Sequence, residues 1–183
     1  MVERREETYR FRLKRRLHDH KNENKKKILF IMLNPSTATE TESDQNSRTD
    51  KTIENIRKII EKWKDYDEWR DYGGGFYVGN RYPHVSSDPK ILKSRPYPDD
   101  IRKENENIIR EMASKCDLVI YAWGTSGPEK NHEEPKWLAE LMKGKDIYCL
   151  GKTKDGCPRH PSPRGSSINI LSNTPILFRT KLT

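Results

Sequence analysis

Two loops of this sequence carry the side chains best suited to chemistry, and the first is Asn34-Pro35-Ser36-Thr37. This segment places an amide directly after an apolar run, where Asn34 can orient a water molecule or a polar substrate atom. An amide takes up no proton near neutral pH, so Asn34 is not expected to act as a general base. The alternative is a turn in which Asn34 caps its own backbone.

The second loop is His160-Pro161-Ser162-Pro163. Three prolines within six residues stiffen the backbone around this histidine, and Lys154, Arg159 and Arg164 make its surroundings cationic. A rigid loop that carries His and Ser suits a site that holds a reactive group and contacts a phosphate. The alternative is a proline-rich turn at the surface.

A third polar side chain, Asn80, ends the apolar run 76–79. Its amide offers both a hydrogen-bond donor and an acceptor, which is what reading the edge of a base requires. A simple turn residue is again the alternative. Cys149, Cys157 and His160 could hold a metal ion only with a fourth ligand, and they lack C-x-x-C spacing. We therefore predict neither a metal nor a cofactor.

The elements that must position these residues alternate along the chain. A run of alternating apolar and basic residues predicts an edge strand over 9–13. Continuous apolar runs predict buried strands over 27–33, 76–79, 118–123 and 147–150. Apolar residues at helical spacing predict helices from the cap Asp50 to Trp63, over 99–115 and over 134–142.

This alternation predicts an α/β fold with three layers, α/β/α, around a mostly parallel central sheet. In such sheets ligands bind at the carboxyl ends of the strands. Asn34, Asn80, Gly124 and the segment 151–163 each follow a predicted strand directly. We therefore expect them to converge on one crevice.

The composition indicates one domain, 1–183, with basic ends. Charged residues make up 35% of the 183 residues and the formal net charge is +8. Residues 1–27 hold 11 Lys and Arg against 5 Asp and Glu, and residues 152–183 hold 6 against 1. Such segments can follow a polyphosphate backbone, although they can equally be a solvated surface.

Membrane and secretory signals are not expected in this sequence. Its apolar runs are too short to span a membrane, and the first 27 residues are charged where a signal peptide would be apolar. Three cysteines do not make a disulfide framework. We expect a cytoplasmic protein without a membrane partner.

Taken in order, the motifs resemble those of the uracil-DNA glycosylase superfamily. Residues 31–35 resemble its water-activating motif, and 78–80 resemble the strand whose final Asn reads the flipped base. Residues 119–124 resemble a core strand that ends in Trp-Gly, and 160–163 match the leaving-group loop His-Pro-Ser-Pro. The resemblance implies a uracil-DNA glycosylase-like domain.

The whole sequence is also similar to the family known as domain of unknown function 1643. The motifs shared with that family are Met-Leu-Asn-Pro-Ser-Thr-Ala, Asp-x-Thr-Ile, Ala-Trp-Gly and Thr-Lys-Asp-Gly-x-Pro-x-His-Pro. The activity of that family is unassigned, so the glycosylase resemblance carries the functional expectation.

By this resemblance, the chain is a DNA glycosylase-like hydrolase of DNA repair that breaks the N-glycosidic bond of a flipped modified or mismatched base. The implied catalytic residues are Asn34 and His160. The implied base-binding residues are Asn80, Ser36 and Trp123. The implied DNA phosphate contacts are Ser162, Lys154, Arg159 and Arg164.

At three positions the sequence differs from the uracil-DNA glycosylases, so the resemblance does not identify which base is recognised. Asn34 stands where they have Asp, Ser36 where a Tyr blocks the thymine methyl group, and Arg164 where a Leu enters the duplex. We expect DNA as the partner of a monomeric chain. The alternatives are a non-catalytic module that binds nucleotides or nucleic acid, and an enzyme that acts on free nucleosides or nucleotides.

Overall fold

The computed structural model describes residues 9, 12–15, 25–35, 51–86, 92, 98–126, 133–163, 170 and 173–182. Within them the strands are β1 (Leu13–Arg15), β2 (Ile28–Met32), β3 (Phe76–Asn80), β4 (Leu118–Tyr121), β5 (Ile147–Cys149) and β6 (Ile176–Arg179). The helices are α1 (Lys51–Trp63), α3 (Asp99–Ser114) and α4 (Lys136–Leu141).

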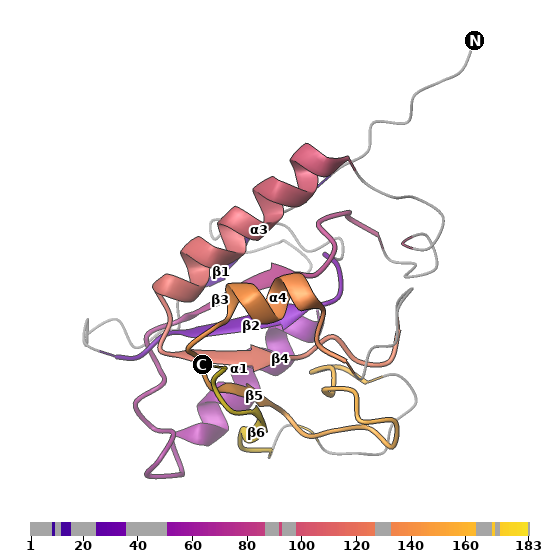
Figure 1. Cartoon of the computed structure of the whole chain (residues 1–183). Helices are drawn as coiled ribbons and strands as arrows, with labels where there is room; N and C mark the ends of the chain where they lie inside the picture. The colour runs from indigo at the N-terminus through magenta and orange to yellow at the C-terminus, as the bar shows by residue number, and fades with distance from the viewer. Residues whose placement is uncertain are drawn as a thin grey trace, which may run out of the picture.

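The six strands form one mixed sheet in the order β1-β3-β2-β4-β5-β6 (Figure 1). The four inner strands are parallel, whereas β1 and β6 pair antiparallel with β3 and β5. The expectation of a mostly parallel sheet is therefore corrected to a mixed one.

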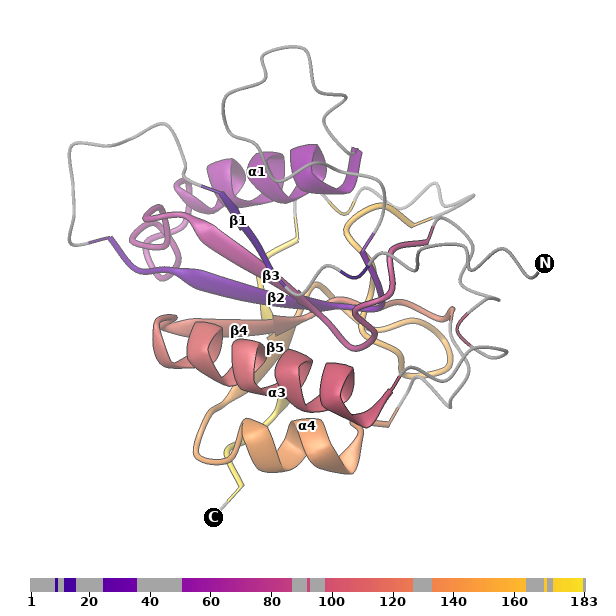
Figure 2. The same ribbon diagram turned by 90° about the horizontal axis from the view of Figure 1, so that it is seen from above.

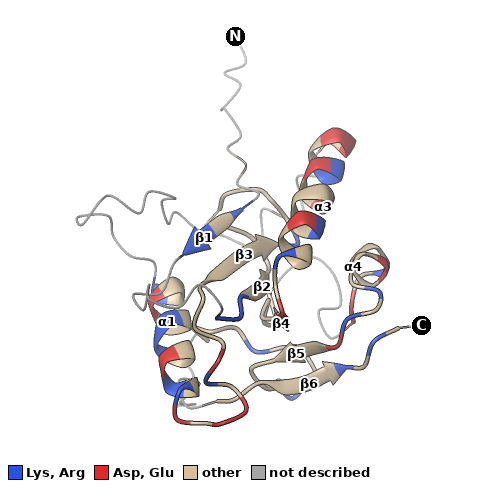
Figure 3. Cartoon of the chain, turned by 90° about the vertical axis from the view of Figure 1, so that its left-hand side faces the viewer, with Lys and Arg blue, Asp and Glu red and all other residues tan. Residues whose placement is uncertain are grey.

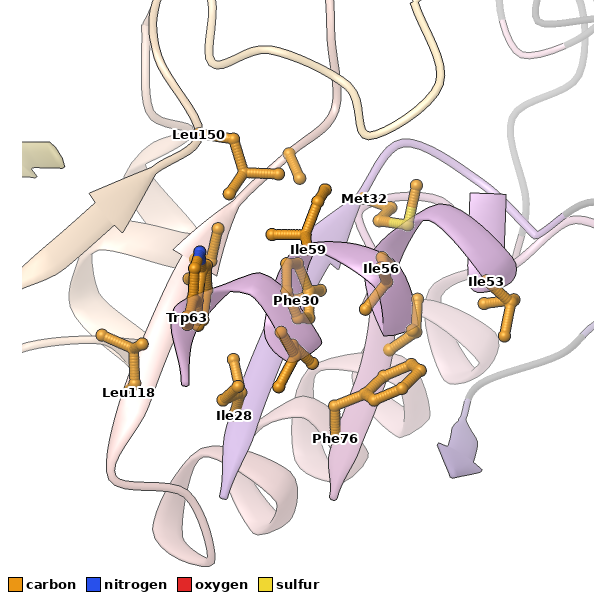
Figure 4. Close-up of a cluster of buried hydrophobic side chains, with 14 of the residues drawn as sticks. Ile28, Phe30, Met32, Ile53, Ile56, Ile59, Trp63, Phe76, Leu118 and Leu150 are labelled. Carbon is orange, nitrogen blue, oxygen red and sulfur yellow. The ribbon is translucent and has the colours of Figure 1, made fainter. Parts of the chain in front are cut away.

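Helices cover both faces of the sheet, as Figure 2 shows from above. On one face, α1 packs Ile56, Ile59 and Trp63 against side chains such as Phe30 and Phe76 (Figure 4). On the other face lie α3 and α4, which contribute buried residues such as Ile109 and Leu138. This double cover explains why the sequence of β2 is apolar at every position.

The two edge strands depart most from the sequence prediction. The described first strand is Leu13–Arg15, which overlaps the predicted range 9–13 only at Leu13, and Tyr9 makes an isolated bridge with His84. The pattern of apolar residues did not predict β6 at all. Ile176 and Leu177 in this strand are 47% and 46% exposed, so no buried face marks it in the sequence.

Lys and Arg alternate with Asp and Glu over the outward faces of α1 and α3 (Figure 3). Pairs such as Lys58 with Glu54 and Arg102 with Asp99 lie one helical turn apart. Exposed pairs of this kind each contribute little to stability. No helix in the described part of the chain is long and apolar enough to cross a membrane.

Candidate functional site

The carboxyl ends of the four parallel strands meet at one edge of the sheet, from which their connecting loops leave (Figure 1). The register aligns Met32 of β2 with Asn80 of β3, and Ile31 of β2 with Tyr121 of β4. Asn34 and Gly124 each lie three residues beyond that second pair. The topology therefore brings Asn34, Asn80 and Gly124 together at the carboxyl ends of the parallel strands.

Residues 151–163, here named the His160 loop, follow β5 and fold back on themselves. Gly156 closes a turn by donating its amide to the Thr153 carbonyl at 3.0 Å, with a positive φ of 77°. Thr153 then donates to the Cys157 carbonyl at 2.9 Å, and Arg159 to the Gly151 carbonyl at 2.9 Å. The loop is thus held by backbone hydrogen bonds as well as by its prolines.

The end of β4 contacts the His160 loop directly. The Gly124 amide donates to the Pro158 carbonyl at 2.9 Å. A Cβ atom built at Gly124 would lie 3.3 Å from Cβ of His160. Two segments that the sequence placed in one crevice therefore touch, and the lack of a side chain at Gly124 permits this close approach.

We expect the substitution Gly124→Ala to displace His160 and to destabilise the fold by about 1–2 kcal/mol, because φ at this position is +74°. Gly144→Ala is a matched control, since Gly144 has a φ of +79° but nothing within 4 Å of the added Cβ. Urea denaturation should give similar losses for the two variants. Only Gly124→Ala should move the NMR signals of the His160 ring, and unchanged signals would contradict the contact.

A backbone hydrogen bond selects the tautomer that the His160 ring adopts when it is neutral. The Ser162 backbone amide donates to Nδ1 of His160 at 3.0 Å, so Nδ1 acts as an acceptor. In the neutral ring the proton then lies on Nε2, which is a hydrogen-bond donor. The ring is half-buried. The His160 loop is also anchored to α1, where Asn55 Nδ2 donates to the Pro161 carbonyl at 2.9 Å.

Asn34 joins two strand ends. Its Nδ2 donates to the Ser86 carbonyl at 2.7 Å and to the Pro35 carbonyl at 3.1 Å. In return, the Ser86 amide donates to the Pro35 carbonyl at 3.0 Å. A carboxylate at position 34 would have no hydrogen to donate to these carbonyl oxygens, so these contacts favour an amide at this position.

Asn80 and Trp123 are both deeply buried, at 3% and 1% exposure. The guanidinium carbon of Arg81 lies 4.8 Å from the centre of a Trp123 ring, and Phe178 and Tyr121 pack against the same side chain. Asn80 and Trp123 therefore both lie in the core, and a base could contact either side chain only if a neighbour moved.

The predicted phosphate contacts are spread over the His160 loop. Lys154 is exposed at its turn, while Arg159 and Ser162 are half-buried. Ser36 and Arg164 lie outside the described residues. Sequence reasoning missed Asn55, Arg81 and Asn105, which carry no spacing signal, although Asn105 breaks the apolar face of its helix.

Two of the buried cysteines, Cys116 and Cys149, are poor nucleophiles. Burial raises the pKa of Cys116 to about 12 and also raises the pKa of Cys149, so both remain protonated thiols at neutral pH. Among the described residues, no three His, Cys, Asp or Glu side chains are grouped so that they could hold a metal ion.

Comparisons with known proteins identify the family of this chain but no individual related protein. Neither the curated proteins nor the solved structures contain a match to this chain. Residues 10–162 match the family described as "Protein of unknown function (DUF1643)". This span includes β1 to β5, the helices α1, α3 and α4, and His160. The chain therefore belongs to the DUF1643 family.

Proposed function

We propose that this chain is a DNA glycosylase-like hydrolase that breaks the bond between a flipped nucleobase and its deoxyribose. The observation that carries the proposal is the hydrogen bond from the Ser162 amide to His160 Nδ1. It makes Nε2 of a neutral imidazole a fixed donor, on a loop seated against the end of β4. A hydrogen-bond donor held in a fixed position can stabilise a leaving group that becomes negatively charged.

The chemical need follows from the reaction. As the glycosidic bond breaks, the sugar takes on oxocarbenium character and negative charge builds on the base. A donor already aimed at that charge stabilises the transition state by about 3 kcal/mol, as donors to oxyanions do. We assign this role to His160 Nε2.

Asn34 would hold the attacking water. Its two amide hydrogens are directed at the Pro35 and Ser86 carbonyls, so the polar atom that remains is Oδ1. That oxygen can accept a hydrogen bond from water and orient it, but cannot remove its proton. An oxocarbenium ion is electrophilic enough that orientation supplies much of what the step needs, and the proton that the added water loses passes to the departed base anion, directly or through solvent.

Recognition of DNA is assigned to the same edge of the sheet. Asn80 would read the polar edge of the base, and Lys154, Arg159, Ser162 and Arg164 would contact phosphates. Flipping a base costs a few kcal/mol, which such phosphate contacts can offset. The basic balance of residues 152–183 supports this assignment.

The direct test is incubation with single- and double-stranded oligonucleotides, each with one modified or mismatched base, followed by hot alkali. We expect strand cleavage at the position of at least one modified base, because alkali breaks the chain at an abasic site. Free nucleosides serve as a second set of substrates. Intact strands with every oligonucleotide would refute the proposal. Release of bases from nucleosides alone would show that the enzyme acts on free nucleosides and not on DNA.

A second candidate is a nucleic-acid-binding module without catalysis. It is favoured by Asn34, whose amide hydrogens serve the backbone of two strand connections, as in a purely structural residue. This alternative predicts DNA binding that weakens steeply with salt while no base is released. A measured salt slope together with the alkali assay separates the two functions.

A further inference from the structure

The peptide unit between Pro161 and Ser162 is hydrogen-bonded on both of its sides. Its N–H, which belongs to Ser162, donates to Nδ1 of His160 at 3.0 Å. Its C=O, which belongs to Pro161, accepts from Nδ2 of Asn55 at 2.9 Å. In a planar trans peptide the N–H and the C=O point in opposite directions, so each hydrogen bond helps to fix the direction of the other group. Asn55 of α1 is therefore coupled to His160 through a single peptide.

The proline does not by itself select this orientation of the peptide. Its ring fixes φ, but ψ can lie in either the α or the extended region. These regions differ by roughly half a turn in ψ, and a change from one to the other exchanges the directions of the Pro161 C=O and the Ser162 N–H. In the exchanged orientation a carbonyl oxygen would face Nδ1 of His160. The choice between the orientations falls to contacts outside the proline, and Asn55 makes such a contact.

The orientation of this peptide determines which nitrogen of the neutral His160 ring carries the proton. With the N–H facing the ring, Nδ1 accepts a hydrogen bond and Nε2 is protonated. With the C=O facing the ring, Nδ1 would carry the proton and Nε2 would become an acceptor. Only the first arrangement lets a neutral His160 donate a hydrogen bond from Nε2.

Helix α1 is a rigid support for the contact of Asn55, because it is also linked to the start of the His160 loop. Trp63 Nε1 donates to the Asn173 carbonyl at 2.9 Å, and Asn173 Nδ2 donates to the Leu150 carbonyl at 2.7 Å. Trp63 and Leu150 lie in one core cluster (Figure 4). Asn55 and Trp63 are about 12 Å apart along the helix axis. The helix thus holds the loop near both of its ends, at Leu150 and at Pro161.

We propose that Asn55 is a positioning residue for base release, which keeps the peptide between Pro161 and Ser162 in the orientation that protonates Nε2 of His160. The proposal rests on the proposed function, because it gives Asn55 a role in the same reaction. That role requires no contact between Asn55 and DNA. It also predicts a property of the protein without substrate, since the tautomer of His160 depends on a side chain of α1.

The substitution Asn55→Asp tests the proposal with little change in side-chain shape at a half-buried position. A carboxylate has no hydrogen to donate to the Pro161 carbonyl, but it can accept from the Ser162 N–H of the exchanged peptide. Nitrogen NMR at about pH 8, where an ordinary imidazole is neutral, should find Nε2 protonated in the wild-type protein and Nδ1 protonated in Asn55→Asp. An unchanged tautomer would overturn the proposal. A ring protonated on both nitrogens would also overturn it, because the new charge would then act by electrostatics alone.

Two further variants make the result independent of the added charge. Asn55→Ala removes the donor without a charge, and should give a mixture of the two tautomers and base release that is about tenfold slower at unchanged DNA affinity. Asn107→Asp adds the same charge at an exposed position of α3 and should change neither quantity. If Asn55→Asp does not fold, Asn55→Ala decides, and a single wild-type tautomer in that variant would overturn the proposal.

The tautomer and the rate of base release are measured separately, so the two proposals can fail separately. A changed tautomer in the Asn55 variants of a protein that releases no base would refute the hydrolase but not the action of Asn55 on His160. Base release by the wild-type protein, with the same tautomer in every variant, would do the reverse.

Discussion

Replacing His160 with alanine should lower the rate of base release by about 100- to 1,000-fold, while binding of the same oligonucleotide changes little. The size of the effect is that of removing one preorganised donor from a developing negative charge. Binding persists because phosphate contacts supply most of the affinity for DNA. Single-turnover cleavage assays and anisotropy titrations on one substrate measure the two quantities.

Two further variants separate a donor role from a packing role. Gln at position 160 retains an amide donor and should recover part of the rate lost in His160→Ala. Asp155→Ala changes an exposed residue of the same loop and should leave the rate unaltered. In the wild-type protein, nitrogen NMR should find Nε2 protonated and Nδ1 unprotonated, because Nδ1 accepts from Ser162. A proton on Nδ1 would contradict the assignment of Nε2 as the donor.

The sequence predicts best those strands and helices that bury a regular set of side chains. The strands β2 and β4 are covered by helices on both faces, so their sequences are continuous apolar runs. The helices α1 and α3 each bury one stripe and show helical spacing. These elements fix where the loops leave the sheet, which is why the contact of Gly124 with the His160 loop could be anticipated.

What the sequence did not predict depends on single contacts between distant residues. Asn55 reaches a carbonyl 106 residues away, and Asn105 reaches one 25 residues away. The spacing of Ile109 and Met112 places Asn105 on the buried face of α3, but no pattern in the sequence indicates which distant carbonyl a polar side chain will reach. The two edge strands are harder to predict because they are short and partly exposed: the predicted edge strand 9–13 overlaps β1 only at Leu13, and β6 was not predicted.

A buried ionic network joins β6 to the rest of the molecule. Arg179 of β6 donates from Nε and from an NH2 group to the two carboxylate oxygens of Glu134, and the Tyr121 hydroxyl donates to the same carboxylate. The side chains of Arg179 and Glu134 are only 15% and 10% exposed. Burial, aided by the Glu134 charge, holds the pKa of Tyr121 well above its usual value, so the phenol keeps the proton it donates.

We expect the substitution Glu134→Gln to lower the free energy of unfolding by about 3–5 kcal/mol, because it leaves the Arg179 guanidinium buried without a counter-charge. Glu111→Gln is the matched control. Glu111 pairs with Lys115 and Arg12, but all three side chains are 45–49% exposed, so its loss should cost less than about 1 kcal/mol. Urea denaturation of the two variants gives both values. Equal losses would mean that the network is solvated and does not hold β6 against β5.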